Sequence, residues 1–331
     1  MNYSKKLLFL AGFSLLIFVA CQKDSALNQS RIGEEEADVA ALNPAARQCA
    51  SHEHNAELMA ADPQFFANQQ SIEESTARFV ANYDRTVSER VVATIPVVVH
   101  VVYRTTAEKI SQAQIQSQID ILNADFRKLN ADRTLIPTNF ASVASDCEVN
   151  FVLSQVIYKL TTKTSFSTND GVKKSAQGGD NPVSPSTKLN IWACTIGGGI
   201  LGYAQFPGGS SATDGVVILN TAFGSTGTAA APYNKGRTAT HEVGHWLNLR
   251  HIWGDATCGS DLVTDTPTHN TANYGCPASG KKSTCTGTPV LMWMNYMDYT
   301  NDACMYMFSA GQKARMQATL ATGGTRAAYK L

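Results

Sequence analysis

The chain has 331 residues, of which 44% are hydrophobic and 16% charged, and its 27 basic residues balance its 27 acidic residues. An ordinary apolar fraction without net charge excludes a fully disordered chain, and the lack of a basic excess argues against a nucleic-acid-binding protein. No apolar run reaches the roughly 18 residues of a membrane-spanning helix, so no conventional membrane span is expected.

The first residues have the pattern of an export signal. Lys5 and Lys6 precede an apolar stretch at residues 7–20, which is too short to cross a bilayer but suits a signal core. Residues 18–21 (FVAC) resemble a bacterial lipoprotein signal, in which Cys21 carries a lipid that anchors the protein to a membrane; simple secretion is the alternative. Either interpretation exports the protein, to the outer membrane or cell surface or into the medium, where cysteines can pair.

An acidic leader follows the signal. Residues 21–90 contain 6 basic and 12 acidic residues, whereas residues 91–331 contain 19 and 15. Residues 22–45 have the composition of a flexible tether, and residues 51–83 have a helix-like composition that is broken at Pro63. We therefore expect a signal at 1–20, a leader at 21–90 and a folded body at 91–331.

The body begins with patterns typical of a sheet covered by helices. A β-branched run at residues 91–103 predicts a buried strand. Ser111 is a candidate N-cap of a helix of about five turns, because apolar residues follow it at helical spacing: Ile115, Ile119, Leu122, Phe126 and Leu129. Further strands are predicted at 149–158, 188–194 and 216–220. This order indicates an α/β (α+β) fold with a mixed sheet.

Residues 197–202 (GGGILG) match the glycine spacing of a dinucleotide-binding loop. That motif requires a helix to begin there, and residues 203–209, which include Pro207, cannot supply one. We therefore interpret this segment as a flexible loop without nucleotide-binding function.

The segment HEVGHWLNLRH at residues 241–251 carries the chemistry of a metal site. His241 and His245, four residues apart on a helix, project from one face and can both reach one Zn²⁺ ion. Glu242 can approach water at the metal without binding the metal itself. His251 can reach the same ion only if the chain bends first, and Asn248 is the best non-glycine residue for the positive φ of such a bend.

This segment resembles the metzincin zinc signature H-E-x-x-H-x-x-G-x-x-H and departs from it only at Asn248. Residues 295–299 (NYMDY) fit the Met-turn of metzincins, and the surrounding sequence resembles the pappalysin group over residues 91–322. The resemblance implies a metzincin-type zincin fold. In that fold a mixed twisted sheet, a backing helix and the zinc helix lie above a cleft, and a loop-rich, disulfide-bonded lower subdomain carries the Met-turn and a C-terminal helix.

The resemblance also implies a zinc endopeptidase made as a zymogen, with residues 21–90 as tether and propeptide and 91–331 as a monomeric catalytic domain. The three histidines would hold the zinc ion, Glu242 would act as general base, and the substrates would be proteins or peptides. Met297 would form an apolar floor, and Tyr299 would stabilise the oxyanion; a packed tyrosine is the alternative. The other function class left open is an exported binding or adhesion lipoprotein with a structural zinc ion.

Seven cysteines remain besides Cys21. Residues 47–49 (RQC) in the leader resemble a cysteine switch, in which the Cys49 thiolate blocks the zinc ion until the leader is removed. The composition shift alone predicts that the leader is cut near Arg85 to Arg90. An incidental thiol is the alternative. Among the late cysteines spacing leaves three connectivities open, and the resemblance implies Cys258–Cys285 and Cys276–Cys304. Cys147 with Cys194, each beside a predicted strand, is a third candidate pair.

Three aspartates lie in a Gly/Thr-rich loop after the zinc motif: Asp255, Asp261 and Asp265. Hard oxygen ligands on flexible backbone suit Ca²⁺, and the pappalysin group binds calcium in this region. Solvated loop aspartates without a metal are the alternative.

One expectation concerns specificity. In one member of the group, an acidic residue directly before the cysteine after the Met-turn favours basic residues after the cut. Here Ala303 holds that place and Asp302 precedes it, which puts a basic preference in doubt.

The histidines outside the zinc motif separate into two kinds. His100 interrupts a predicted buried strand and is expected to be a hydrogen-bonded core residue, whereas His52, His54 and His269 are expected at the surface.

Overall fold

The computed structural model describes residues 46–83 and 92–331. The predicted signal at 1–20, Cys21, the tether and the expected cut near Arg85 to Arg90 lie outside the described residues. All described residues belong to one compact unit, residues 41–331. None of the described helices is long and apolar enough to cross a bilayer.

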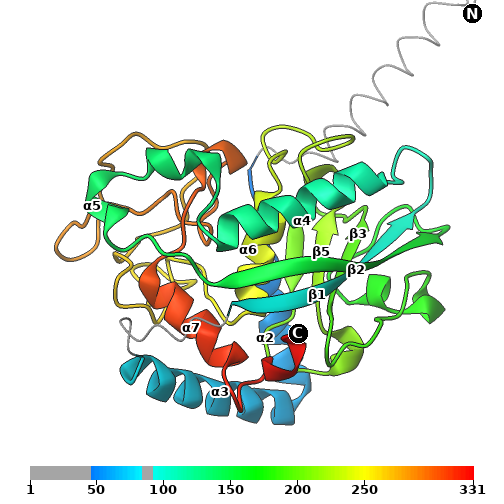
Figure 1. Cartoon of the computed structure of the whole chain (residues 1–331), viewed down its shortest axis with the longest axis horizontal. Coiled ribbons are helices and arrows are strands. Elements are labelled where there is room, and N and C mark those ends of the chain that lie inside the picture. Colours follow the sequence, from blue (N-terminus) through cyan, green and yellow to red (C-terminus); the bar gives the residue numbers. More distant parts are fainter. Residues whose placement is uncertain (1–45, 84–91) are drawn as a thin grey trace, which may run out of the picture. The chain divides into compact units, whose positions relative to one another are not determined.

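A five-stranded sheet with the order β2-β1-β3-β5-β4 forms the centre of the body (Figure 1). Its first four members in this order run parallel, and β4 runs antiparallel to β5 at the edge, which confirms the predicted mixed sheet. Nine of the eleven residues of β1 are buried, as expected for a parallel strand that is covered on both faces. The strands are β1 (Ala93–Tyr103), β2 (Val149–Leu160), β3 (Leu189–Cys194), β4 (Gly202–Ala204) and β5 (Val216–Leu219).

The helices follow the predicted apolar spacing. The leader forms α2 and α3, which are separated at Asp62, whose side chain caps α3, and at Pro63, the first residue of α3. Ser111 caps α4 as predicted, accepting from Gln114 N at 3.1 Å. The helix ends before Leu129, because Lys128 adopts a positive φ of 52°. The helices are α2 (Ser51–Ala61), α3 (Pro63–Ala81), α4 (Gln112–Phe126), α5 (Thr138–Ala141), α6 (Arg237–Trp246) and α7 (Ala310–Leu320).

The body contains two apolar cores. The larger core joins the sheet to α4, α6 and the last helix, and a smaller core lies among the loops after α6 and includes Ile252, Met292 and Trp293. Two disulfides, Cys258–Cys285 and Cys276–Cys304, hold this loop-rich part together. Both are the pairs that the resemblance implies, and the expected lower subdomain is therefore present.

The predicted pair Cys147–Cys194 is wrong, because both residues are buried free thiols. Val149, just after Cys147, pairs with Ala93 at the start of β1, whereas Ala193 pairs with Val101 near the end of that strand. Eight extended residues, about 26 Å, separate the two positions along the sheet, whereas a disulfide needs Cα atoms less than about 7 Å apart.

Two of the three histidines that we expected at the surface are buried. His54 lies 3.2 Å from the Asp170 carboxylate, and His269 accepts from Met292 N at 3.1 Å. His52 is exposed, as predicted. His100 is the predicted core residue, with its ring nitrogens 2.6 Å from Asp180 Oδ2 and 2.8 Å from Asn190 Oδ1.

Candidate active site

Three histidines converge at the end of α6. His241 and His245 lie one helical turn apart, and the Nε2 atom of His245 lies 3.1 Å from that of His241 and 3.1 Å from that of His251. Two tetrahedral nitrogen ligands of one zinc ion, each at about 2.0–2.1 Å, would lie about 3.3 Å apart. The two distances from His245 Nε2 are therefore close to those expected for ligands of a single zinc ion.

The bend that brings in His251 occurs at Asn248, as the sequence predicts. Asn248 has φ 71°, and α6 ends there with a Schellman motif: Leu249 N donates to Gly244 O, and Asn248 N donates to His245 O. The left-handed residue turns the chain back on itself, so His251 faces the same point as the two helical histidines.

The other ring nitrogen of each histidine is held by an acceptor. His241 Nδ1 donates to Tyr296 O at 2.7 Å, His245 Nδ1 to Leu249 O at 2.8 Å, and His251 Nδ1 to Asp255 Oδ1 at 2.5 Å. These contacts orient each ring and leave the Nε2 lone pairs free for a metal. Burial and the neighbouring imidazoles lower the pKa of His245 to about 3 and that of His241 well below its usual value. Both rings are thus neutral, as metal ligands must be.

Cys49 of the leader completes the group. Its Sγ atom and one ring nitrogen from each of the three histidines all lie within 4.8 Å of one another, and all four residues are buried. Burial and the nearby Glu242 carboxylate raise the pKa of the thiol well above its usual value. A zinc ion held there would reverse that effect, because a coordinating thiol loses its proton. Three imidazoles and one thiolate would supply the four ligands that zinc takes in a closed site.

Glu242 lies directly beside this group and is 1% exposed. Its Oε2 atom accepts from Ser51 Oγ at 2.7 Å and lies 3.4 Å from Cys49 Sγ, so the leader covers the carboxylate. Burial raises the pKa of Glu242 to about 7. Gly202 leaves room for this side chain, because a Cβ atom there would lie 2.9 Å from Glu242 Cγ. A carboxylate in this place can accept a proton near neutral pH.

The Met-turn lies beneath α6. Met297 is fully buried, and its Sδ atom would lie 2.5 Å from a Cβ atom at position 244, so only glycine fits there. Tyr296 O accepts a hydrogen bond from His241 Nδ1, and Met297 O accepts one from Ile252 N at 3.1 Å. The turn thus supports the first histidine from below.

Tyr299 is the last residue of the Met-turn segment and contacts the leader. Its hydroxyl donates to Cys49 O at 3.1 Å and accepts from Cys49 N at 3.3 Å. Its ring also lies at the edge of His251, with 5.0 Å between centroids. The hydroxyl thus contacts a peptide group next to the histidine cluster. Burial raises the pKa of Tyr299, so the hydroxyl remains protonated.

The leader lies in the cleft as an extended segment along the edge strand β4. Leu201 N donates to Gln48 O at 2.9 Å, and Ala50 N donates to Gly202 O at 3.1 Å, which makes a short parallel bridge. This is the β-augmentation by which sheet edges take up extended peptides. The space between the edge strand and the histidines is therefore already occupied by a peptide, the extended segment of the leader.

Arg47 fills a pocket that we did not predict. Its side chain is 1% exposed, and its guanidinium contacts Asp302 Oδ1 at 2.5 Å, Thr300 O at 3.2 Å and Thr238 Oγ1 at 3.2 Å. The Tyr233 ring covers it at 5.1 Å. The sequence puts a preference for basic residues in doubt, because Ala303 stands where an acid is expected. In the structure Asp302, one position earlier, binds a basic side chain.

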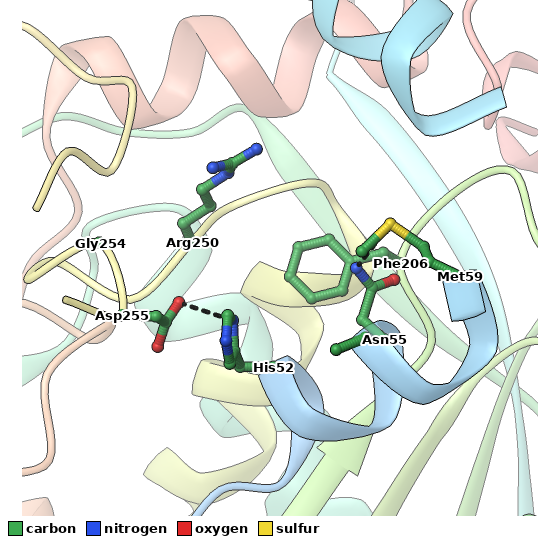
Figure 2. A pocket seen from close by; sticks show the side chains of 8 residues that line it. His52, Asn55, Met59, Phe206, Arg250, Gly254 and Asp255 are labelled. Atoms are coloured by element: carbon green, nitrogen blue, oxygen red, sulfur yellow. Dashed lines mark hydrogen bonds and ion pairs between the residues drawn. The ribbon is translucent and has the colours of Figure 1, made fainter. Parts of the chain in front are cut away.

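A pocket of about 120 Å³ separates the leader helix α2 from the bend after α6. Figure 2 shows His52 and Asp255 in contact in the pocket lining, with His52 Nδ1 3.2 Å from Asp255 Oδ2. Asp255 therefore links the leader to the His251 ring. Hydrogen bonds from both histidines outweigh the effect of burial and hold the pKa of Asp255 below its usual range.

The three aspartates proposed for calcium do not form one group. Asp255 contacts His251, Asp261 accepts from Thr266 Oγ1 at 2.8 Å, and Asp265 accepts from Ser309 Oγ at 2.6 Å and from Gly311 N at 2.8 Å at the start of α7. Among the residues that the structure describes, the histidine and cysteine cluster is the one group of metal-ligating side chains that converges. A calcium ion bound by the three aspartates together is not supported by this arrangement.

Comparisons with known proteins agree with this geometry. The peptidase M43 family model, described as pregnancy-associated plasma protein-A, matches residues 195–321. An extracellular metalloprotease of Verticillium alfalfae is 35% identical over 63% of this chain and 69% of its own length. Another, from Arthroderma gypseum, is 31% identical over 84% of this chain and 86% of its own length.

Two solved structures of mirolysin from Tannerella forsythia are also similar. A promirolysin mutant is 42% identical, with a TM-score of 0.78, and covers 86% of this chain and 97% of its own. Mature mirolysin with a cleaved peptide is 46% identical, with a TM-score of 0.71, and covers 73% of this chain and 96% of its own. The precursor thus matches a larger share of this chain than the mature form does.

Proposed function

This chain belongs to the pregnancy-associated plasma protein-A (pappalysin) family of metalloendopeptidases, and we propose that His241, His245 and His251 hold its catalytic zinc ion. The observation that carries the proposal is the convergence of three buried imidazoles beside the Glu242 carboxylate. A binding protein with a purely structural zinc ion would not need this carboxylate at the open side of the histidine group.

The residues of the chain divide the chemistry between them. Zinc held by three imidazoles supplies a Lewis acid that acidifies water and polarises a carbonyl group. Glu242 then accepts the proton of the attacking water and donates it to the leaving amine. The Tyr299 hydroxyl donates to Cys49 O in the precursor. It would donate in the same way to the oxyanion of a substrate peptide that binds there once the leader has left.

The leader keeps the precursor latent. Cys49 occupies the position that water needs, Ser51 ties up the general base, and Arg47 fills the neighbouring pocket. This proposal is supported by the promirolysin neighbour, which matches the leader as well as the body. Removal of the leader opens the cleft and frees the edge of β4 for a peptide substrate. The extracellular metalloproteases among the relatives support an exported protein.

We expect chelation to abolish activity. In the processed protein, incubation with ortho-phenanthroline should stop peptide hydrolysis and added Zn²⁺ should restore it, because the site can activate water and polarise the carbonyl group only with the ion bound. The isomer meta-phenanthroline, which cannot chelate, is the control. Hydrolysis that persists after the zinc content has fallen to zero would contradict the proposed function.

Asp302 should set a preference for a basic side chain beside the scissile bond. Because a hydrogen bond to a charged group contributes about 1.5–3 kcal/mol, Asp302→Asn should lower kcat/KM roughly 10- to 100-fold for a peptide with arginine in this pocket. A peptide with methionine there should be cleaved equally by both proteins. Asparagine keeps an oxygen acceptor for Lys235 N and Arg237 N, so the fold is retained. An equal loss on both peptides would argue against a specificity role.

A further inference from the structure

The leader contacts the body at a second place, away from Cys49. One face of α3 is buried, and its residues recur at helical spacing: Phe65, Gln69, Ile72 and Thr76. Figure 1 shows α3 and α7 side by side, and the two helices are in contact. Asn68 also donates to Gly208 O at 2.9 Å, beyond the edge strand. An amphipathic helix therefore docks on the body independently of the cysteine.

Glu73 is the charged centre of this contact. Its two carboxylate oxygens lie 2.8 and 3.0 Å from Arg315 Nη2, and Oε1 accepts from Asn248 Nδ2 at 3.2 Å. Arg250 lies 3.9 Å away at the rim. Arg315 is 3% exposed and Asn248 is 1% exposed, so the carboxylate reaches donors that water barely contacts. A charge-assisted pair in such surroundings is screened by salt less than one at the surface.

Arg315 forms an ion pair with this carboxylate. Its Nη2 atom also donates to Asn248 O at 3.1 Å, and its Nε atom is buried without a hydrogen-bond partner among the described residues. Glu73 is its ion-pair partner in the described part of the chain. If α3 leaves, the guanidinium loses this carboxylate and is hydrated instead, so the ion pair contributes to binding of the leader. The body thus retains affinity for a carboxylate at this place.

We propose that Arg315, Asn248 and Arg250 form a docking site for an acidic amphipathic helix, and that α3 remains bound there after the chain is cut within residues 84–91. The proposal rests on the proposed function, because the retained leader would keep Cys49 in the cleft. The site also gives the asparagine of the zinc motif a second use: its backbone bends the chain toward His251, while its side chain holds the leader.

Charge and tethering support this occupant. Residues 21–90 carry twice as many acidic as basic residues, 12 against 6, and residues 91–331 have a basic excess, 19 against 15. Opposite charges favour association of the two parts. Before the cut, the connecting chain holds the leader at an effective concentration of about the millimolar range. After the cut the leader becomes a separate inhibitor, and the contact of Glu73 with Arg315 decides at which concentration it dissociates.

The test uses the full precursor, with a recognition sequence for a specific protease placed within residues 84–91. After complete cutting, size-exclusion chromatography over a dilution series measures the leader that stays bound. Glu73→Gln removes the charge, and Glu74→Gln is the matched control, because Glu74 is 73% exposed and its ion pair is with Arg78 of the same helix. Thermal unfolding of the uncut proteins checks that both variants fold.

We expect Glu73→Gln to raise the dissociation midpoint roughly 10- to 100-fold, with hydrolysis appearing at correspondingly higher protein concentrations, while Glu74→Gln behaves like the parent. High salt should reduce the difference in dissociation midpoint between Glu73→Gln and the parent. Equal midpoints for the two variants would overturn the proposal. Retention is measured without any activity, so a Glu73-dependent midpoint with no hydrolysis in any protein would uphold the docking site and contradict the proposed function instead.

Discussion

Replacing Glu242 by glutamine in the processed protein is expected to lower the rate of peptide hydrolysis by about 10²- to 10⁴-fold while zinc stays bound. The expected loss reflects the role of the side chain: an amide of nearly the same shape cannot accept the proton of the attacking water. The zinc ion should remain, because the three imidazoles that would hold it are oriented by Tyr296, Leu249 and Asp255, and none of these contacts involves Glu242.

The measurement is single-turnover hydrolysis of a fluorogenic peptide together with zinc analysis of the same samples. Both proteins should be freed of the leader by an added protease, so that loss of self-processing is not mistaken for loss of catalysis. Hydrolysis by Glu242→Gln at the parent rate, with equal zinc content, would remove Glu242 from the mechanism.

Substituting Cys49 by serine in the full precursor is expected to give hydrolysis before any cut, roughly tenfold or more above the parent precursor. A serine hydroxyl stays protonated near neutral pH and is a far weaker zinc ligand than a thiolate, so water can enter. Activity should remain below that of the processed protein, because Arg47 and Ser51 still contact Asp302 and Glu242.

Cys194→Ala is the matched control for this experiment. Cys194 is also a buried free thiol, but it lies at the end of β3 and outside the histidine cluster. Its precursor should stay as latent as the parent. Full latency of Cys49→Ser would assign the thiol no part in inhibition and would leave the other leader contacts to explain it.

The central site could be predicted because its signals are local. His241, His245 and Glu242 lie within one helical segment, and the bend at Asn248 follows from the backbone preference of a single residue. The apolar spacing of α4 likewise predicts which of its residues face the core. In each case the residues that decide the structure are neighbours in the sequence.

The contacts of the leader could not be predicted in the same way. Arg47 and Asp302 are separated by 255 positions, and no pattern in either segment points to the other. Strand β4 has only three residues, too few for an alternating pattern. The sequence therefore predicts a flexible loop at residues 197–202, although Gly202 begins the edge strand that holds the leader.

Errors arose where a residue's environment depends on the tertiary fold. Pairing Cys147 with Cys194 ignored the register of parallel strands, which places the two thiols at opposite ends of the sheet. His54 and His269 are buried because Asp170 and Asp298 lie close to their rings, and polar partners of this kind are brought together only by folding.

X-ray absorption spectroscopy at the zinc edge tests the central claim most directly, because it reports the atoms bound to the ion. In the intact precursor we predict three nitrogen scatterers at about 2.0–2.1 Å and one sulfur scatterer at about 2.3 Å. After the leader has been cut and removed, the sulfur signal should be replaced by oxygen while the three nitrogen scatterers remain. A zinc ion bound by fewer than three imidazoles, or a shell without sulfur in the latent precursor, would contradict the account.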